Sequence, residues 1–434
     1  MSVVVTWPTA VLGRYVELIN GYAFPSDEFT EGEGMPLIRI RDLNHSDTEV
    51  NFCGKFTERY VVRKSDLLIG MDGDFSTIRW RGNEALLNQR VCKLVTKDEA
   101  LVSQEFLFYR IIDEIKAINR ITAATTVKHL SSKDVLEIVI ELPSKPEQTK
   151  IAEILSTVDR AIEQTEALIA KQQRLKTGLM QDLLTRGIDE HGNLRSEETH
   201  EFKDSPMGRI PVEWEVRRID ELLAKVDPPM RSGPFGSALL KEELVESGIP
   251  LLGIDNVHVE RFVSDFTRFV EPKKAKSLKR YLVRPGDIMI TIMGTVGRCC
   301  VVPDDIGPAL SSKHTWTISV DPSRYSPYLA CLQVNHASWV LQHFAQGEQG
   351  GIMASIKADT LRSTLLPVPP PDEMLKIESL LKAVSAKISV EQDNLEKNRA
   401  VKTALMQDLL TGRKRILASS GELSARNQKV KINE

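Results

Sequence analysis

The sequence has few cysteines, and none are spaced as a C-x-x-C pair. Five occur in 434 residues. An odd number without zinc-ligand spacing argues against a disulfide framework and against structural zinc. We therefore expect a chain that needs neither metal nor disulfides and that resides in the reducing cytoplasm. The cysteines are Cys53, Cys92, Cys299, Cys300 and Cys331.

Long apolar runs and common enzyme motifs are also missing. No window of 18 consecutive apolar residues occurs, so no membrane span is expected. The N-terminus lacks the charged-then-apolar pattern of an export signal. A Walker phosphate loop, a helicase acidic motif and paired metal-binding carboxylates are absent too, which gives motor and nuclease functions little support.

The chain lacks an excess of positive charge. Its formal net charge is −3, and residues 1–142 contain 17 basic and 21 acidic side chains. Residues 211–366 contain 18 of each. A nucleic-acid-binding protein of this composition has to use local basic patches or a partner's positive surface.

What the sequence does contain is a long internal repeat. Residues 179–185 and 405–411 both read Leu-Met-Gln-Asp-Leu-Leu-Thr. The offset of 226 residues holds without a gap back to positions 150 and 376. A repeat of this length predicts a duplicated, pseudo-twofold architecture.

Each copy of the repeat is predicted to be one long helix. Apolar residues recur at steps of three, four and seven along both copies, which places them in one stripe on a helix. Prolines precede each copy, and Gly187 and Gly412 follow. Neither helix can bury its stripe alone. We expect an antiparallel, coiled-coil-like pair in which the 377–409 stripe is faced by Ile151, Leu155, Val158 and Ile162.

Two globular segments share a plan and alternate with the helices. Gly248–Leu252 echoes Gly34–Ile38, and residues 283–290 echo residues 62–69. In the first segment we expect a helix over 104–121 and a polar loop at 125–130. Expected strands there cover 36–41, 66–69 and 135–142.

The predicted fold class is α+β, with two similar mixed α/β domains joined by two long antiparallel helices. The segments between the repeated helices determine the boundaries. We assign a first domain to 1–142, a first helix to 143–187, a linker to 188–210, a second domain to 211–366, a second helix to 367–415 and a polar tail to 416–434.

These features together resemble the specificity subunit of type I restriction–modification enzymes, over nearly the whole chain. The motifs are Pro146-Glu147-Gln148, Gly178–Thr185, the Ile-Pro-x-x-Trp of 210–214 and the Gly-Pro-Phe-Gly-Ser of 233–237. The second helix departs from the pattern, since its Pro371–Met374 entry lacks the glutamine.

The resemblance implies that this chain recognises DNA but catalyses no reaction itself. The two domains would be target-recognition domains, each reading one half of a split double-stranded DNA site. The helices would set the half-site spacing and dock two methyltransferase subunits, and restriction subunits would then join. S-adenosylmethionine, ATP and Mg would be bound by partner subunits, with no cofactor or metal in this chain. We assign docking to Leu179, Met180, Leu183, Leu184, Leu405, Met406, Leu409 and Leu410.

The candidate base-reading residues are loop-borne side chains of the types that recognise base edges. Arginine pairs with guanine, and asparagine or glutamine pairs with adenine. A basic run from Lys273 to Arg280 is a candidate for phosphate contacts, although a solvated helix face explains it equally well. The candidates are Arg39, Arg41, Asn44, Arg79, Arg81, Asn88, Gln89, Arg90, Lys128, Asn256, Lys273, Lys274, Arg298, Lys313, His314 and Lys357.

Two other functions fit parts of the sequence. Asp227-Pro228-Pro229-Met230 is similar to the Asp-Pro-Pro-aromatic motif of amino-methyltransferases. Methylation of a base requires an aromatic ring on which the flipped base stacks, and Met230 offers none. The second alternative is a coiled-coil adaptor without a nucleic-acid role, which leaves the duplicated domains unexplained.

Overall fold

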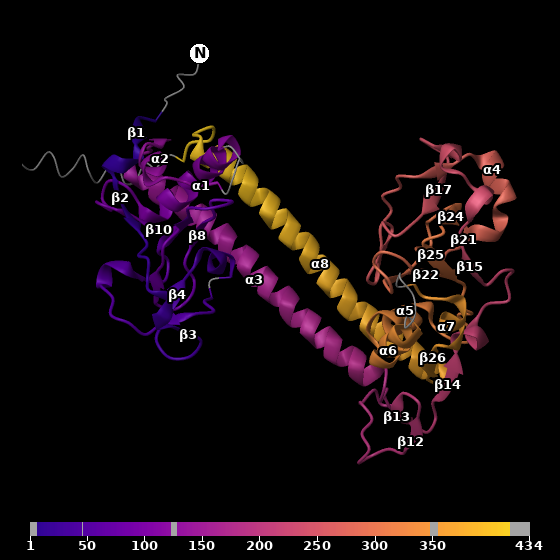
Figure 1. Ribbon diagram of the computed structural model, residues 1–434. Helices are drawn as coiled ribbons and strands as arrows, with labels where there is room; N and C mark the ends of the chain where they lie inside the picture. Colours follow the sequence, from indigo (N-terminus) through magenta and orange to yellow (C-terminus); the bar gives the residue numbers. More distant parts are fainter. Residues whose placement is uncertain (1–6, 46, 123–127, 348–354, 417–434) are drawn as a thin grey trace, which may run out of the picture. The chain divides into compact units, whose positions relative to one another are not determined.

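The computed structural model describes residues 7–45, 47–122, 128–347 and 355–416. It divides into two compact units. Unit 1 comprises Met1–Ala167 and Gln392–Glu434, and unit 2 comprises Leu168–Glu391. Both predicted helices are present as single elements, α3 (Lys145–Leu183) and α8 (Pro371–Leu410). Each contributes one part to each unit, so each unit consists of a globular head and two helix segments (Figure 1).

The head of unit 1 is built on an antiparallel four-stranded sheet that is covered by α1 (Gln104–Ile121) (Figure 1). Alternate residues of its strand β7 face opposite sides, so that Leu67 and Ile69 pack with α1 and Leu68 packs into a second cluster. Both faces of this strand are therefore buried. The order is β2 (Val16–Asn20), β10 (Val91–Thr96), β7 (Leu67–Gly70) and β8 (Thr77–Arg79).

A second, five-stranded sheet completes this head. All its pairings are antiparallel except β4 with β9. Its order is β3 (Phe29–Thr30), β5 (Asn51–Phe52), β4 (Met35–Ile38), β9 (Ala85–Leu87) and β6 (Val61–Val62). The first and last strands of the head form a separate two-stranded sheet, in which β1 (Thr9–Val11) pairs with β11 (Val139–Glu141).

Unit 2 repeats this topology strand for strand. Its four-stranded sheet is again antiparallel, its five-stranded sheet again has one parallel pair, and β14 (Glu215–Arg218) pairs with β26 (Leu365–Val368). The duplication predicted from the helices therefore extends to the heads. The orders are β15 (Met230–Ser232), β25 (Thr315–Ile318), β22 (Ile288–Thr291), β23 (Cys299–Val301), and β16 (Leu244–Val245), β20 (Phe269–Val270), β17 (Ile249–Leu252), β24 (Ala309–Ser311), β21 (Leu282–Val283).

Two hairpins distinguish unit 2. The first, β12 (Phe202–Ser205) with β13 (Gly208–Pro211), lies almost entirely in the segment predicted to be a linker, which therefore contains regular structure. The second is β18 (Val257–His258) with β19 (Arg261–Phe262). The helices of this head are α4 (Pro272–Ser277), α5 (Pro327–His336), α6 (Ser338–Gly347) and α7 (Ala358–Ser363).

Short 3₁₀ helices precede or follow several strands in both heads. They lie at η1 (Leu12–Arg14), η2 (Ser26–Glu28), η3 (Ile40–Asn44), η4 (Glu58–Tyr60), η5 (Ile219–Leu222), η6 (Gly236–Ala238), η7 (Lys241–Glu243) and η8 (Lys279–Tyr281).

Local structure agrees with the sequence prediction in two elements and departs from it in two. The strand expected over 66–69 is β7. The helix expected over 104–121 is α1. The strand expected over 36–41 ends at Ile38, and η3 begins at Ile40. The strand expected over 135–142 begins later, because Ser131 caps α2 (Ser132–Leu136) and accepts a hydrogen bond from the Asp134 amide at 3.1 Å. Residues 125–127 of the predicted loop and residues 417–434 of the predicted tail lie outside the described residues.

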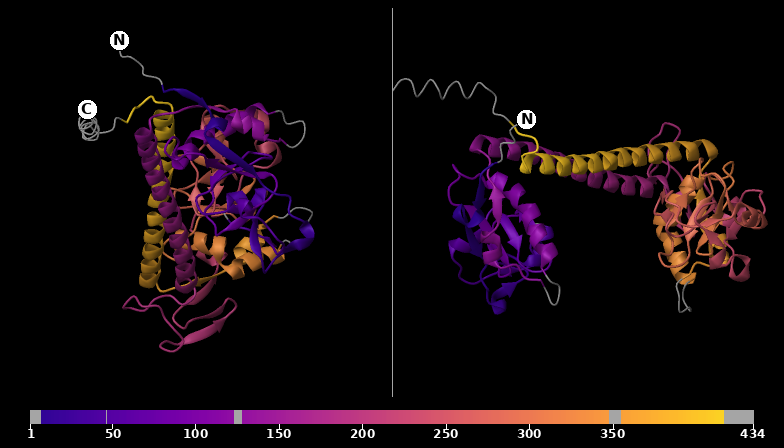
Figure 2. Two further views of the ribbon diagram at one scale, coloured as in Figure 1. Left: turned by 90° about the vertical axis from the view of Figure 1, so that its left-hand side faces the viewer. Right: turned by 90° about the horizontal axis from the view of Figure 1, so that it is seen from above.

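In unit 1 the beginning of α3 packs antiparallel against the end of α8 (Figure 2). The apolar contact unites Ile151 and Leu155 with Leu409 and Leu410. Two ion pairs fix the direction, Asp159 with Lys402 and Glu166 with Arg399, each at 2.7 Å. Residue numbers therefore rise along one helix as they fall along the other.

In unit 2 the two helix segments share a core with the head, in which Leu183 joins Ile377 and Leu381. The predicted stripe is buried near the heads and only partly elsewhere. Val158 and Ile162 are half-buried. Leu175 and Val401 are 57% and 49% exposed, so the expectation of a continuous seam is wrong at these positions.

Candidate functional site

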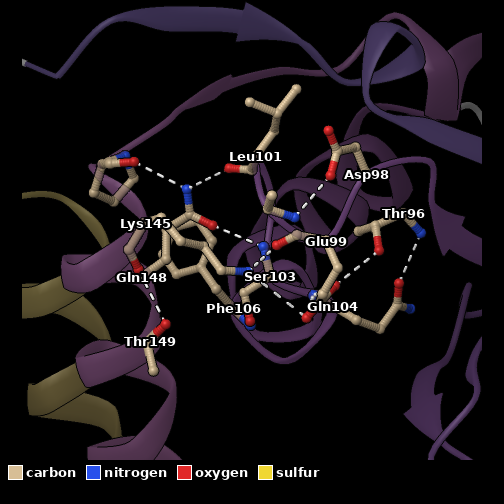
Figure 3. A network of polar contacts seen from close by, with 12 residues as sticks. Thr96, Asp98, Glu99, Leu101, Ser103, Gln104, Phe106, Lys145, Gln148 and Thr149 are labelled. Atoms are coloured by element: carbon tan, nitrogen blue, oxygen red, sulfur yellow. Dashed lines mark hydrogen bonds and ion pairs between the residues drawn. The ribbon is translucent and has the colours of Figure 1, made fainter.

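The Gln148 side chain explains the Pro-Glu-Gln motif at the start of α3. It is buried and donates to the carbonyls of Leu101 at 3.0 Å and Pro143 at 2.9 Å. It also accepts from the amide of Ser103 at 2.8 Å, and Ser103 is the N-cap of α1 (Figure 3). One glutamine thus joins the first turn of the long helix to the first turn of the head's helix.

Neighbouring polar contacts extend this network to the sheet (Figure 3). Gln104 accepts from the amide of Thr96 and donates to the carbonyl of Leu94, both at 2.8 Å. Glu99 accepts from the Gln104 amide at 2.9 Å, and Lys145 donates to the Glu99 carbonyl. Strand β10, helix α1 and helix α3 are therefore linked through side chains as well as through the apolar core.

A buried glutamate at the start of α8 performs a related task in unit 2. Glu373 accepts from the amide of Ile188 at 2.8 Å, from the indole of Trp214 at 3.0 Å and from Arg195 at 3.1 Å. These partners all lie after the end of α3, in the segment that leads into the second head. We call this the Glu373 clasp.

Unit 1 contains the counterpart at Glu147, which lies 226 residues earlier. Glu147 accepts from Arg415 at 2.8 Å and from the Ser144 hydroxyl at 2.9 Å, and Arg415 lies 5.2 Å from the Trp7 ring centre. Burial alone would raise the pKa of Glu147, but the hydrogen bonds from Arg415 and Ser144 outweigh it and hold that pKa below its ordinary value. The second helix thus lacks the glutamine of the first but keeps its glutamate.

The residues predicted to dock partners lie largely inside the chain's own cores. Met180, Leu183 and Leu184 are buried in unit 2, and Leu409 and Leu410 in unit 1. Leu179, Leu405 and Met406 are half-buried against the same cores. The docking assignment is corrected, because an apolar stripe that fills a core is not available to another subunit.

The loop after β9 presents two of the predicted reading residues. Gln89 and Arg90 are exposed, and Arg90 has a φ of 72°. The loop is held by Tyr22, whose amide donates to the Leu87 carbonyl at 3.0 Å and whose carbonyl accepts from the Gln89 amide at 2.9 Å. Asn88 is buried and accepts from the same amide, so it shapes the loop.

The second head has the same arrangement with different side chains. The Gly233 amide donates to the Ser312 carbonyl at 3.1 Å, next to exposed Lys313 and half-buried His314. Burial lowers the pKa of His314, and the charges of Lys313 and Arg268 lower it further, which favours the neutral ring. A Cβ on Gly233 would overlap Ser311 and Ser312, as one on Gly21 would overlap Asn88, so both backbones require glycine for close approach.

Arg90 pairs with Asp72 at 3.5 Å, and several other candidates of the first head also have intramolecular partners. Arg39 pairs with Asp42 and Glu49. Arg81 pairs with Glu163, and Lys128 donates to the Asn119 carbonyl at 2.7 Å. Arg41 and Asn44 are exposed on η3.

Arg79 is the most enclosed of these arginines. Its guanidinium lies 4.3 Å from the ring centre of Phe108 and 4.9 Å from that of Tyr109, and it pairs with Glu105 at 2.6 Å. Together with Asn44 and Arg81 it lines a cleft of about 1130 Å³. Arg79 therefore supports the packing of α1, and little of its guanidinium is available to contact a base.

In the second head, Asn256 is structural. It is 2% exposed, accepts from the Gly253 amide and donates to the carbonyls of Val263 and Asp265, which leaves it no capacity to read a base. Its assignment as a reading residue is corrected, because its amide stabilises the turn around the β18–β19 hairpin.

The basic run is a surface patch made by α4 and η8. Lys273, Lys276, Lys279 and Arg280 are exposed, whereas Lys274 pairs with Glu243 at 2.7 Å. Lys357 is also exposed, and Arg298 is half-buried. Four exposed cations on adjoining turns suit phosphate contacts, which position a protein on DNA without reading sequence.

The remaining chemistry-bearing features are structural. Met230 of the Asp-Pro-Pro-Met segment is buried in the unit 2 core, and the Pro228 carbonyl accepts from Arg231 at 3.3 Å. In the part of the chain that the structure describes, no cluster of three His, Cys, Asp or Glu side chains could hold a metal ion. The described helices include none long and apolar enough to cross a membrane.

Comparisons with known proteins agree on one family. The family model of the type I restriction modification DNA specificity domain matches residues 5–172. The EcoBI specificity subunit of Escherichia coli is 30% identical over 312 residues, which cover 70% of this chain and 64% of that protein. The MjaVIII specificity subunit of Methanocaldococcus jannaschii is 24% identical over 94% of this chain and 93% of its own.

A solved structure shows the same fold over nearly the whole chain. The S subunit of the type I restriction–modification system from M. genitalium has a TM-score of 0.63. It is 16% identical, and the match covers 94% of this chain and 97% of that one. The α+β fold with two heads and two long helices is therefore confirmed by an independent structure.

Proposed function

We propose, from the premise that this chain belongs to the specificity subunits of type I restriction–modification systems, that each head reads one half of a divided DNA site. The observation that carries the proposal is the repeated sheet order of the two heads combined with different side chains in the corresponding loops. One loop presents Gln89 and Arg90, and the other presents Lys313 and His314. A shared scaffold with different reading groups suits two different short sequences.

The chemistry of these loops suits base edges in the major groove. A glutamine can bond both edge atoms of adenine, and an arginine both acceptors of guanine, with about 1–3 kcal/mol of discrimination for each good pair. Lys313 would donate to guanine, and neutral His314 could donate or accept. The patch of Lys273, Lys276, Lys279 and Arg280 would contact phosphates next to the second half-site.

Partner subunits would complete the activity. We propose two methyltransferase subunits and restriction subunits as partners, with S-adenosylmethionine, ATP and Mg bound there, while this chain performs no chemistry. The near-neutral heads favour this division, because phosphate neutralisation supplies most of the affinity for DNA. Exposed apolar side chains along the long helices replace the buried ones as candidate docking residues, namely Leu168, Leu175, Leu375, Leu380 and Val390.

The test is an exchange of the first head. Residues 1–142 are replaced with those of a relative, the chimera is coexpressed with the methyltransferase subunit, and methylated sites are sequenced across the genome. We expect one half of the recognised site to change while the other half and the gap stay the same, since well-separated contacts contribute almost additively. The parent chain is the control. A change in both half-sites would contradict the proposal.

The adaptor alternative is not favoured, because it assigns no task to the reading loops. The same experiment decides it: a chain without a nucleic-acid role would leave the methylated sequence unaltered when its head is exchanged.

A further inference from the structure

The repeat places the same cation at the junction of helix and head in both units. Lys402 of α8 and Lys176 of α3 lie 226 residues apart. Their side chains are 27% and 13% exposed, and each pairs with a carboxylate that is less than one-fifth exposed. These are not solvated surface pairs, whose contribution is usually small. The two junctions nevertheless differ in where the carboxylate comes from.

In unit 1 the carboxylate belongs to the helix pair. Asp159 of α3 pairs with Lys402 at 2.7 Å and also accepts from the hydroxyl of Tyr109 of α1 at 2.7 Å. The lysine therefore joins helix to helix, and the head contributes a tyrosine hydroxyl.

In unit 2 the position equivalent to Asp159 is Ser385. Its hydroxyl lies 3.0 Å from that of Tyr328 of α5, so the tyrosine contact persists. A serine cannot neutralise Lys176, and a half-buried lysine without a counter-charge is costly. Glu260 of the second head supplies the charge instead and pairs with both Lys176 and His336, the latter at 2.7 Å.

Glu260 is held in place by its surroundings. It lies in the turn of the β18–β19 hairpin, which occupies the interval between β17 and β20; the corresponding interval of the first head contains η3. Its amide donates to the Cys299 carbonyl at 2.9 Å, and its φ of 57° is unusual for a residue other than glycine. Burial would raise the pKa of Glu260, but hydrogen bonds from His336 and Lys176 outweigh it, so the carboxylate stays charged.

The contact of Lys176 lies at a different height along α3 from the apolar core that holds the head. Met180 and Leu183, one to two turns further along α3, are buried in the apolar core shared with the head. That core holds the head to the helix. The contact at Lys176 provides a second, polar attachment that lies earlier in α3, displaced along the helix axis by about 1.5 Å for each intervening residue. Because it lies at a different height from the shared apolar core, this contact adds a restraint on rotation of the head relative to α3.

We propose that the contact of Lys176 with Glu260 and His336 is a positioning joint that sets the gap accepted between the two half-sites. The inference rests on the proposed function, because only a protein that reads two half-sites has a gap to set. Each base step adds about 3.4 Å along DNA, so a rotation of the head that moves its reading loop by that length would change the accepted gap by one base pair. The joint acts through the head and touches no base.

The experiment measures gap preference in the complex of the chain with its methyltransferase subunit. Substrates keep both half-sites constant and vary the gap by one or two base pairs, and methylation rates are read by sequencing. Lys176→Met and Glu260→Gln remove the ion pair, Lys176→Arg retains it, and Lys171→Met changes an exposed lysine of the same helix as a control.

We expect Lys176→Met and Glu260→Gln to lower the preference for the parent gap over its neighbours by about tenfold, the size of coupling seen between contacting residues. The bases read in each half-site should stay the same, and Lys176→Arg and Lys171→Met should behave as the parent. A merely structural role would lower methylation at every gap equally, and that result would overturn the proposal.

Two further outcomes also decide the matter. An unchanged gap preference in both Lys176→Met and Glu260→Gln overturns the inference while leaving the two-head function intact. If the parent complex shows no divided site at all, the proposed function itself fails. Because the parent is measured on the same substrates, the two failures are distinguished within one experiment.

Discussion

Removal of the Glu373 carboxylate should destabilise unit 2 far more than removal of its counterpart destabilises unit 1. Glu373→Ala leaves the Arg195 guanidinium, which is 9% exposed, without its counter-charge. It also leaves the Trp214 indole and the Ile188 amide without their acceptor. These groups are buried, so water cannot take the place of the carboxylate.

The expected magnitude follows from burial. Loss of one partner from a buried ion pair costs about 3–5 kcal/mol of unfolding free energy. At Glu147 the arginine partner, Arg415, is 31% exposed, so water can solvate it after the change. Glu147→Ala should therefore lower the unfolding free energy by about 1–2 kcal/mol, the range expected when a charged hydrogen bond is lost and water partly replaces it. The double variant Arg195→Met, Glu373→Met should recover much of the loss, because an apolar pair needs no counter-charge.

Hydrogen exchange measured by mass spectrometry suits a chain with two units, because it reports the opening of each region separately. In Glu373→Ala the peptides around Ile188 should exchange faster, with a fall in opening free energy of about 3–5 kcal/mol, while unit 1 peptides keep their protection. A loss below about 1 kcal/mol, or an equal loss in Glu147→Ala, would refute the argument from burial.

Three further predictions concern single contacts. Gln148→Ala should lower the unfolding free energy by about 1–3 kcal/mol, since it leaves a buried amide unpaired; a thermal midpoint equal to the parent's would contradict this. Arg90→Ala should relax the preference at one base pair of one half-site by about 1–3 kcal/mol, measured by methylation of single-base variants, and relaxation in both half-sites would count against it. Because the pKa of Glu260 is depressed, its contribution to stability is present above the ordinary value of 4.5 and lost as the pH falls through the lower folded value. Acid unfolding should show this loss in the parent, and a Glu260→Gln variant with the same acid response would argue against it.

The long helices could be predicted because their signal is periodic and local. Apolar residues at helical spacing, prolines at the entry and Gly187 after the end fixed the extent of α3 to within a few residues. The same holds for α1, whose start is marked by the N-cap Ser103. The β12–β13 hairpin was missed because its strands are short and polar, although Pro206 and Gly208 signal a turn.

The residues of the candidate site were harder to predict from the sequence, because whether a polar side chain is available to contact DNA depends on its burial. Gln89 and Asn256 are both amides in loops, yet only Gln89 is exposed. The difference arises from backbone groups that Asn256 contacts up to nine residues away. The leucines at the ends of the helices were misassigned for a similar reason: periodicity identifies an apolar stripe, but it cannot distinguish an interior neighbour from another subunit.

The two clasps and the two junctions show that the repeat preserves contacts while moving the residues that make them. Glu147 and Glu373 remain at equivalent positions, but their arginines come from segments outside the repeat. Lys402 and Lys176 also remain, whereas the carboxylate has moved from α3 in unit 1 to the head in unit 2. A first head moved into the second position would lack the β18–β19 hairpin, and Lys176 would face Ser385 without a counter-charge. We therefore expect a head to function when exchanged between relatives at the same position but not when moved between the two positions of one chain, even though the two heads have the same sheet order.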